Sequence, residues 1–216
     1  MRIGTWNLAG RWSDVHASFL LDLDCDVLLL TEVSDRVLLP GYSLHLGGPE
    51  MARRRRWAGI ASRVPPTPLP DPHPASAMAV VDGWTYCSSI LPWRSAGRRE
   101  PWAGARHAEW TAACVAELLQ NVPSDRLIWG GDWNHALCGR EHAGSIAGRS
   151  AILAALEKLD LVVPTADLPH HIPGLLSIDH IAVPRGTRAQ ARAVGAMLDG
   201  RRLSDHEAYV LDALVG

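Results

Sequence analysis

A β-hairpin signal at Asp82-Gly83 restricts the folds open to this chain more than any other sequence feature. The dipeptide separates two strand-like runs, Ala77–Val81 and Trp84–Leu91, and a two-residue Asp-Gly connection is typical of a tight turn between antiparallel strands. Parallel neighbours in a sheet need a long crossover instead of such a turn. The chain is therefore not expected to be a purely parallel, doubly wound fold.

Strand-like runs outnumber helix-like runs along the whole sequence. The spacing of apolar residues predicts three helices: one over residues 13–23, one that contains Trp110 and Leu118 and ends near Pro123, and one that contains Ile152 and Leu159. The other predicted strands are residues 2–7, 26–32, 41–46, 57–62, 126–131, 177–183, 191–195 and 208–214. This pattern predicts an α/β (α+β) chain with mixed β-sheets.

Three segments between these runs are expected to lie at the surface. Prolines recur from Val64 to Pro74, and because proline cannot donate to a strand ladder, we expect an extended surface stretch or sheet edge there. The run Arg53–Arg56 is expected in a polar loop, and Trp93 to Arg106 is expected to be a loop rich in arginine, glycine and tryptophan.

Length and composition favour one domain over residues 1–216. A hydrophobic content of 47% is too high for a disordered chain, and no apolar run approaches the ~20 residues of a membrane span. The polar start, Met1 to Asn7, does not resemble a signal peptide, and the four cysteines lack metal-site spacing. We therefore expect a cytoplasmic protein with reduced thiols, no membrane span and no obvious protein partner.

Charge limits the ways in which this chain can bind a polyanion. The net charge of −2 lacks the basic surplus that supplies non-specific affinity for DNA. Affinity for a long polyanion would have to come from local arginines, so a short or small substrate remains open.

Polar side chains follow the predicted strands at five places. Each has an ordinary explanation as a turn residue, but together they offer carboxylates, amides and a histidine on one small domain. Carboxylate oxygens are the ligands that Mg²⁺ prefers, and Mg²⁺ takes only one or two of them from a protein. These places are Asn7, Glu32, Asp132 with Asn134, Asp179 with His180, and Ser204-Asp205-His206.

The same residues carry a resemblance that covers nearly the whole chain. Trp6-Asn7, Thr31-Glu32, Gly131-Asp132-Trp133-Asn134, Ser177-Ile178-Asp179-His180 and Ser204-Asp205-His206 stand in the order and character of one superfamily. The chain resembles the endonuclease/exonuclease/phosphatase superfamily, which includes DNase I and the exonuclease III type of abasic-site endonuclease. The resemblance implies two packed mixed β-sheets flanked by helices, a DNase I-like four-layer sandwich, with the site at one edge.

The resemblance also implies a metal site. Glu32 would be the principal ligand of Mg²⁺, or of Mn²⁺, with Asn7 and Asp205 as further ligands or in the surrounding shell. The metal would neutralise charge on the phosphate and on the leaving oxygen.

The catalytic roles that the resemblance implies fall on four further residues. Asp132 would hold or deprotonate the attacking water, and Asn134 would donate to a phosphate oxygen. His206 would contact the phosphate, with Asp179 behind it to fix the imidazole tautomer and raise its pKa.

One position departs from the superfamily pattern. A catalytic Tyr or His commonly ends a middle strand, but here that position falls at Ser89 or Ile90. Either another residue such as Arg94 or His107 supplies the missing phosphate contact, or activity is reduced.

Two further groups are candidates for substrate binding. Arg53, Arg54, Arg55 and Arg56 form either a phosphate-binding loop or a solvated one. Trp57, Trp93 and Trp102 lie beside arginines in expected loops, where they would stack on a base or sugar or instead fill the core.

Three functions remain open from the sequence. The first is Mg²⁺-dependent hydrolysis of phosphate esters by a phosphodiesterase or nuclease that acts on nucleic acid. The second is a phosphatase or phosphodiesterase for a small-molecule or lipid-headgroup phosphate. The third is a catalytically weak module that only binds phosphate.

Overall fold

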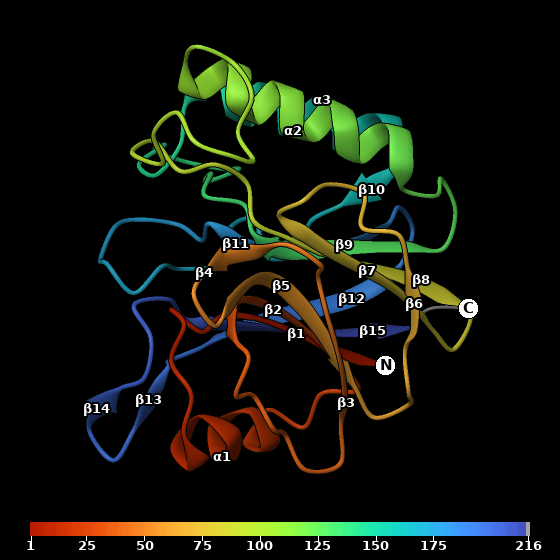
Figure 1. Cartoon of the computed structure of the whole chain (residues 1–216), viewed down its shortest axis with the longest axis vertical. Helices are drawn as coiled ribbons and strands as arrows, with labels where there is room; N and C mark the ends of the chain where they lie inside the picture. Colours follow the sequence, from red (N-terminus) through yellow and green to blue (C-terminus); the bar gives the residue numbers. More distant parts are fainter. Residues whose placement is uncertain (215–216) are drawn as a thin grey trace.

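Two mixed β-sheets pack face to face in the computed structural model, which describes residues 1–214 (Figure 1). The first sheet contains β1 (Arg2–Asn7), β2 (Val27–Ser34), β3 (Ser43–Leu46), β4 (Glu50–Ala52), β5 (Arg55–Ser62), β12 (Arg188–Val194) and β15 (Ala208–Leu214). The second sheet contains β6 (Thr67–Leu69), β7 (Ser76–Val81), β8 (Trp84–Ser89), β9 (Leu127–Asp132), β10 (Leu161–Val162) and β11 (Asp179–Pro184). A short hairpin pairs β13 (Met197–Leu198) with β14 (Arg201–Arg202).

The strand order explains why both sheets are mixed. The first sheet has the order β12-β15-β1-β2-β5-β3 with β4 beside β5, and the second has the order β10-β11-β9-β8-β7-β6. The pairs β1–β2 and β8–β9 are parallel. Each is joined through a helix, α1 (Asp14–Asp22) or α2 (His107–Asn121), as the crossover between parallel strands requires.

Helices cover the outer face of each sheet (Figure 1). Helix α1 lies on the first sheet, whereas α2 and α3 (Ile146–Lys158) lie together on the second. One apolar cluster that includes Leu29, Ile60 and Ile128 fills the space between the sheets. Two others lie under the helices, around Phe19 and around Leu118. The predicted α/β (α+β) four-layer sandwich is confirmed.

Two local features predicted from the sequence, the Asp82-Gly83 hairpin and the proline-rich edge, form in the structure. Strands β7 and β8 form the predicted hairpin, with Asp82 and Gly83 both at positive φ (48° and 75°), as a tight hairpin turn requires. The proline-rich segment supplies β6 as the edge strand of the second sheet, where a missing N–H donor is tolerated.

The predicted arginine loop is partly wrong. Arg55 and Arg56 belong to β5, and Glu50 of β4 pairs with Arg56. Arg53 and Arg54 alone form the turn between the two strands. Arg55 and Arg56 are both half-buried at the start of β5, between β2 and β4. A long side chain can pack its stem along a sheet while its guanidinium reaches water, so a run of arginines does not exclude a strand.

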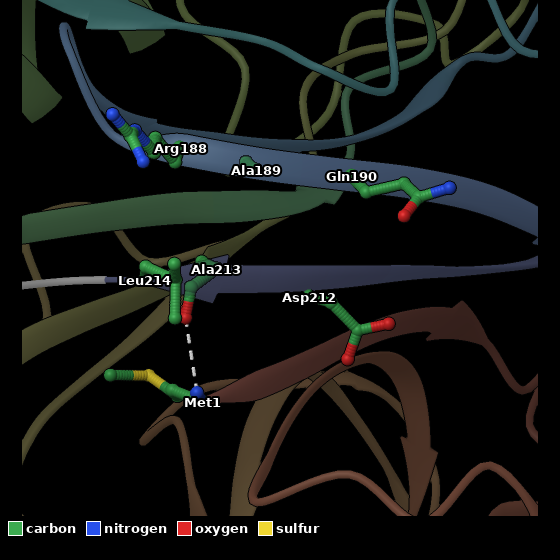
Figure 2. Close-up of a pocket in the computed structure, with 7 residues that line it drawn as sticks. All are labelled: Met1, Arg188, Ala189, Gln190, Asp212, Ala213 and Leu214. Carbon is green, nitrogen blue, oxygen red and sulfur yellow. Dashed lines mark hydrogen bonds between the residues drawn. The ribbon is translucent and has the colours of Figure 1, made fainter.

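The two sheets bring several strand ends to one edge of the sandwich. Asn7 ends β1 beside Thr31 of the parallel strand β2. In the second sheet, Asp132 ends β9 directly opposite Asp179, which begins β11. A cavity of about 450 Å³, lined by Met1, Asp212 and others, lies away from this edge, at the opposite end of β1 (Figure 2). Within residues 1–214, no helix is long and apolar enough to cross a membrane.

Candidate active site

Asn7 connects the carboxylates of Glu32 and Asp132 at the edge of the sandwich where the strand ends meet. Its Nδ2 donates to Asp132 Oδ2 at 2.9 Å and to Glu32 Oε1 at 3.3 Å. Its Oδ1 accepts the backbone N–H of Ala9 at 2.8 Å, which holds the amide in this orientation. Asn7 is buried and thereby links the first sheet to the second at the site.

The turn after β9 fixes Asp132 in place. Gly131 has a φ of 120°, and a Cβ there would overlap the carbonyl oxygen of Ser89, so the close approach of β8 and β9 requires glycine. Asp132 Oδ1 then accepts the N–H of Asn134 at 3.0 Å, and Asn134 has a φ of 52°. The Nδ2 of Asn134 donates to the carbonyl oxygen of Leu91 at 3.0 Å.

A carboxylate, an imidazole and a second carboxylate lie in sequence across the site. His206 Nδ1 is 2.7 Å from Asp179 Oδ2, and its Nε2 is 3.8 Å from Asp132 Oδ2. The loop that carries His206 is anchored by Ser204, whose hydroxyl donates to the carbonyl oxygen of Asn7 at 2.6 Å. The imidazole is therefore held in one orientation, with its Nε2 directed toward Asp132.

Burial is the largest influence on the pKa of Asp132 and of His206, and neighbouring charges decide the outcome. Burial raises the pKa of Asp132, the charge of His206 opposes this rise, and the charge of Asp179 adds to it. Burial alone would lower the pKa of His206, but the carboxylates of Asp179 and Asp132 more than reverse the effect and raise it. The geometry therefore favours an imidazolium at His206.

Glu32 stands at the side of this arrangement and faces an arginine. It has a φ of 49°, which turns its side chain out of the β2 ladder, and its Oε2 accepts from Arg55 NH1 at 2.8 Å. The guanidinium lies against Gly10, where a Cβ would overlap it. Both carboxylate oxygens of Glu32 thus have a partner, Asn7 on one and Arg55 on the other.

The donor chemistry at the site fits a hard divalent cation. Glu32, Asp132 and Asp179 supply carboxylate oxygens, and Asp179 Oδ1 is buried without a hydrogen-bond partner in the described part of the chain. Oxygen ligands of this kind suit Mg²⁺ or Mn²⁺. Asp132, Asp179 and His206 also bring one ligand atom each within 4.8 Å of one another.

The remaining predicted residues lie at different distances from this centre. Asp205 is exposed beside His206 and adds to the rise of its pKa. Arg54 pairs with Asp35 at 3.0 Å, Arg53 is exposed in the turn, and Arg56 donates to the carbonyl oxygen of Gly48. Of the four consecutive arginines, only Arg55 contacts a predicted site residue.

The two candidates for the missing phosphate contact are bonded to backbone near the site. Arg94 donates through Nε and NH2 to the carbonyl oxygen of Gly144 at 2.9 and 2.7 Å. His107 Nε2 lies 2.7 Å from the carbonyl oxygen of Pro92, and its Nδ1 lies 3.2 Å from Ser145 Oγ. A role for either residue in phosphate binding remains a prediction.

Neither residue at the end of β8 reaches the site. The Ser89 hydroxyl is buried between Ser76 Oγ at 2.9 Å and Trp129 Nε1 at 3.2 Å. Ile90 is buried in the cluster under α2 and α3. The end of β8 therefore supplies no side chain to the site in place of the catalytic Tyr or His that is common in the superfamily.

Two of the three tryptophans fill the core, which is the second of the two roles left open for them by the sequence. Trp57 and Trp102 are buried and pack edge to face, with ring centroids 5.2 Å apart. Trp93 is half-buried, and Arg99 lies over its ring. The loop from Trp93 to Arg106 folds its aromatic residues inward, because their apolar area gains more from burial than from exposure.

The sequence did not reveal the contact between Arg55 and Glu32. The sequence makes Arg55 a candidate as part of the arginine run, but its partner depends on the register of β2 against β5, in which Val33 pairs with Arg56. Register is set by the packing of whole strands. The glycine at position 10 leaves room for the guanidinium, but a single glycine in the sequence does not indicate which side chain approaches it.

Comparisons with known proteins agree with this geometry. The sequence model of the endonuclease/exonuclease/phosphatase family matches residues 4–206. Among curated proteins, the search found no significant match.

Solved structures with the same fold include three nucleases. A 3′-5′ exonuclease from Neisseria meningitidis superposes with a TM-score of 0.70 at 18% identity, covering 99% of each chain. The endonuclease domain of TRAS1, a telomere-specific non-LTR retrotransposon, has a TM-score of 0.66 at 16% identity over 99% of this chain and 98% of that one. An AP endonuclease from Leishmania major has a TM-score of 0.65 at 15% identity over 97% of this chain and 86% of that one.

These structures share the fold at low identity, whereas the family match spans most of the sequence and includes every strand end described above. The chain therefore belongs to the endonuclease/exonuclease/phosphatase family of hydrolytic phosphoesterases.

Proposed function

We propose that this chain is a Mg²⁺-dependent phosphodiesterase and that nucleic acid is its substrate. The observation that carries the proposal is the alignment of Asp179, His206 and Asp132, with Asn7 joining Asp132 to Glu32. This arrangement supports the assignment of an acid, a base and an oxygen-rich cation site to one edge of the sandwich. The same proposal takes residues 1–216 as one domain.

The chain's own residues divide the reaction between them. The His206 imidazolium, oriented by Asp179, contacts a non-bridging phosphate oxygen and stabilises the charge that develops there. Asp132 orients the attacking water and accepts its proton, a task that suits a carboxylate whose pKa burial has raised. Asn134 donates its remaining amide hydrogen to the phosphate.

The metal is assigned to Glu32. Glu32 would hold Mg²⁺ or Mn²⁺, with Asn7 and Asp205 in the surrounding shell. Asn7 turns its Nδ2 toward Glu32 and its Oδ1 toward Ala9, so it would orient the carboxylate of Glu32. When bound, the ion neutralises charge on the phosphate and on the leaving oxygen. Asp132, Asp179 and His206 have the spacing of a metal site, but the 2.7 Å bond between His206 Nδ1 and Asp179 supports a shared proton there instead of a metal.

Nucleic acid is favoured over a compact substrate by the surroundings of the site. Arg55 lies within the site, and Arg53 is exposed in the adjoining turn. The similar structures named above are an exonuclease, an endonuclease domain and an AP endonuclease. A phosphatase or phosphodiesterase for a small or lipid-headgroup phosphate is the second candidate, because the net charge of −2 does not favour a long polyanion.

One panel of substrates tests the proposal. Plasmid DNA, single-stranded DNA, RNA and bis-para-nitrophenyl phosphate are incubated with Mg²⁺ or Mn²⁺, each with a chelator control. We expect chelator-sensitive cleavage of at least one nucleic acid. Turnover of the small diester alone would favour the second candidate, and no chelator-sensitive turnover at all would leave a phosphate-binding module.

The same assay is applied to Asp132→Ala and to a matched control. Loss of Asp132 is expected to reduce cleavage by about 10²–10³-fold, the usual effect of removing one positioned group. Asp212→Ala removes a carboxylate at the opposite end of β1, where it pairs with Arg2, and should cleave like the wild type. Circular dichroism of both variants confirms folding, and full activity in folded Asp132→Ala would refute the assigned site.

A further inference from the structure

Arg55 occupies the carboxylate that the proposed function assigns to the metal. Its NH1 donates to Glu32 Oε2 at 2.8 Å, while Asn7 Nδ2 approaches the other oxygen of Glu32 at 3.3 Å. A cation that binds Glu32 must therefore share this carboxylate with a guanidinium or replace it. The metal ion and the Arg55 guanidinium are both positively charged, and both would bind the carboxylate of Glu32.

The guanidinium of Arg55 packs against the backbone of Gly10. Gly10 has a φ of 68°, and a Cβ at this position would overlap Nε, Cζ and NH2 of Arg55. The N–H of Gly10 donates to the carbonyl oxygen of Glu32 at 2.9 Å, which ties the loop after β1 to the same strand end. The loop, Glu32 and Arg55 thus form one packed unit.

Most of the donor capacity of Arg55 is still free. An arginine presents five N–H donors, and within residues 1–214 the hydrogen bond to Glu32 is the one that its side chain makes. The side chain keeps 35% of its surface exposed. Arginine matches the paired oxygens of a phosphate better than lysine does.

We infer that Arg55 exchanges partners during binding: it pairs with Glu32 in the free protein and moves to the substrate phosphate when a divalent cation takes Glu32. Arg55 is thereby a phosphate-binding residue of the proposed reaction and the group that couples metal binding to substrate binding. The inference rests on the proposed function for the location of the metal, and it adds a residue and a linkage to it.

The exchange has a thermodynamic consequence. The metal must displace Arg55 from Glu32, so Arg55 weakens metal binding in the absence of phosphate. Phosphate captures the released guanidinium, so it strengthens metal binding, and the metal strengthens phosphate binding by the same factor. Direct contact between metal and phosphate adds to this coupling in any variant, and the share due to Arg55 is the part that disappears with the side chain.

The experiment measures binding without turnover. Mn²⁺ affinity is determined by electron paramagnetic resonance or calorimetry, with and without dimethyl phosphate as a diester probe that also reports its own affinity. The proteins are the wild type, Arg55→Gln, Arg55→Lys and Arg63→Gln. Arg63 lies at the other end of β5 and pairs with Asp24, so its variant changes the net charge equally and leaves Glu32 untouched.

Arg55→Gln is expected to bind Mn²⁺ about two- to fivefold more tightly than the wild type when no phosphate is present, the scale of a partly exposed ion pair. The same variant should bind dimethyl phosphate more weakly and lose at least about twofold of the coupling between the two ligands. Arg55→Lys keeps a charge but not the planar fork, so it should compete with Mn²⁺ and still lose phosphate affinity. Arg63→Gln should match the wild type throughout.

Unchanged or weaker Mn²⁺ binding by folded Arg55→Gln would overturn the exchange. So would a coupling factor equal to that of the wild type. These outcomes are separable from failure of the proposed function, because Glu32→Gln tests the metal location by itself: if it binds Mn²⁺ as tightly as the wild type does, the proposed metal site is wrong.

Discussion

Asp179 determines how His206 is charged and where it points. The carboxylate lies 2.7 Å from His206 Nδ1 and, after the opposing effect of burial, is the largest influence that raises the pKa of the imidazole. A neutral amide at position 179 would keep the size of the side chain but remove the charge. The protonated form of the imidazole would then lose the carboxylate charge that stabilises it most.

We therefore expect Asp179→Asn to lower the pKa of His206 and to reduce cleavage by about 10²–10³-fold. The pKa is followed through the imidazole proton resonances during a pH titration, and activity is measured on the substrate that the wild type cleaves best. Asp167→Asn, an exposed carboxylate outside the site, is the control. An unchanged His206 pKa in Asp179→Asn would show that the charge on His206 has another source.

At the scale of elements, the approach of β8 to β9 holds the turn that carries Asp132. The two strands are parallel, and Leu91 N–H donates to the carbonyl oxygen of Asp132 at 3.0 Å just beyond β8. Gly131 sits at the closest point, where its missing Cβ leaves room for the backbone of Ser89. Its φ of 120° is also unfavourable for any residue with a side chain.

Gly131→Ala is expected to lower the free energy of unfolding by roughly 2–4 kcal/mol, since it combines backbone strain with overpacking. Gly41→Ala is the matched control: Gly41 has a φ of 78°, but a Cβ there meets nothing within 4 Å, so only the conformational cost of about 1 kcal/mol applies. Urea unfolding measures both values. Equal losses in the two variants would mean that the contact between Gly131 and Ser89 contributes nothing.

Signals that act over a few residues predicted most of the elements. The Asp82-Gly83 turn, the apolar run of β2 and the helical spacing around Trp110 each depend on neighbours in sequence, and each was found near its expected place. Strand β4 and the hairpin of β13 and β14 were not predicted, because elements of two or three residues carry no period long enough to recognise.

The site was predictable where its residues end strands, and less so where contacts join different sheets. Asn7, Asp132 and Asp179 follow or begin apolar runs, so their convergence at one edge could be expected. The ion pair of Arg55 with Glu32 depends on strand register, and the burial of Trp102 against Trp57 depends on how a long loop packs. Neither is encoded in local spacing.

At the scale of the whole molecule, buried histidines make stability depend on pH. Burial lowers the pKa of His73, His135 and His180 to about 4, from an ordinary value of 6.5. An unfolded chain would protonate these rings below about pH 6.5, whereas the folded chain resists until about pH 4. Their contribution to stability is therefore complete above pH 6.5 and is lost as the pH falls toward 4.

Two groups of the site act in the opposite direction. The pKa of Asp132 is raised above its ordinary value of 3.8, so this carboxyl stabilises the fold at low pH and loses that effect as the pH rises. The raised pKa of His206 makes its contribution decline as the pH rises above 6.5. Three histidines outweigh one carboxyl in the acid range, and stability is expected to be greatest near pH 6.5.

The free energy of unfolding is therefore expected to fall between pH 6.5 and pH 4, with each buried histidine contributing up to about 1.4 kcal/mol per pH unit. The variant His73→Asn isolates the contribution of one of these histidines to the fall in unfolding free energy. His73 Nδ1 accepts the N–H of Ala75 at 3.0 Å, an interaction that an asparagine oxygen two residues upstream can replace without titrating. Urea unfolding at several pH values gives the slope of the unfolding free energy against pH. This slope should be shallower for the variant than for the wild type, by an amount that corresponds to at most one bound proton. If the two slopes coincide, His73 is protonated equally in both states, and burial does not set the acid sensitivity of this fold.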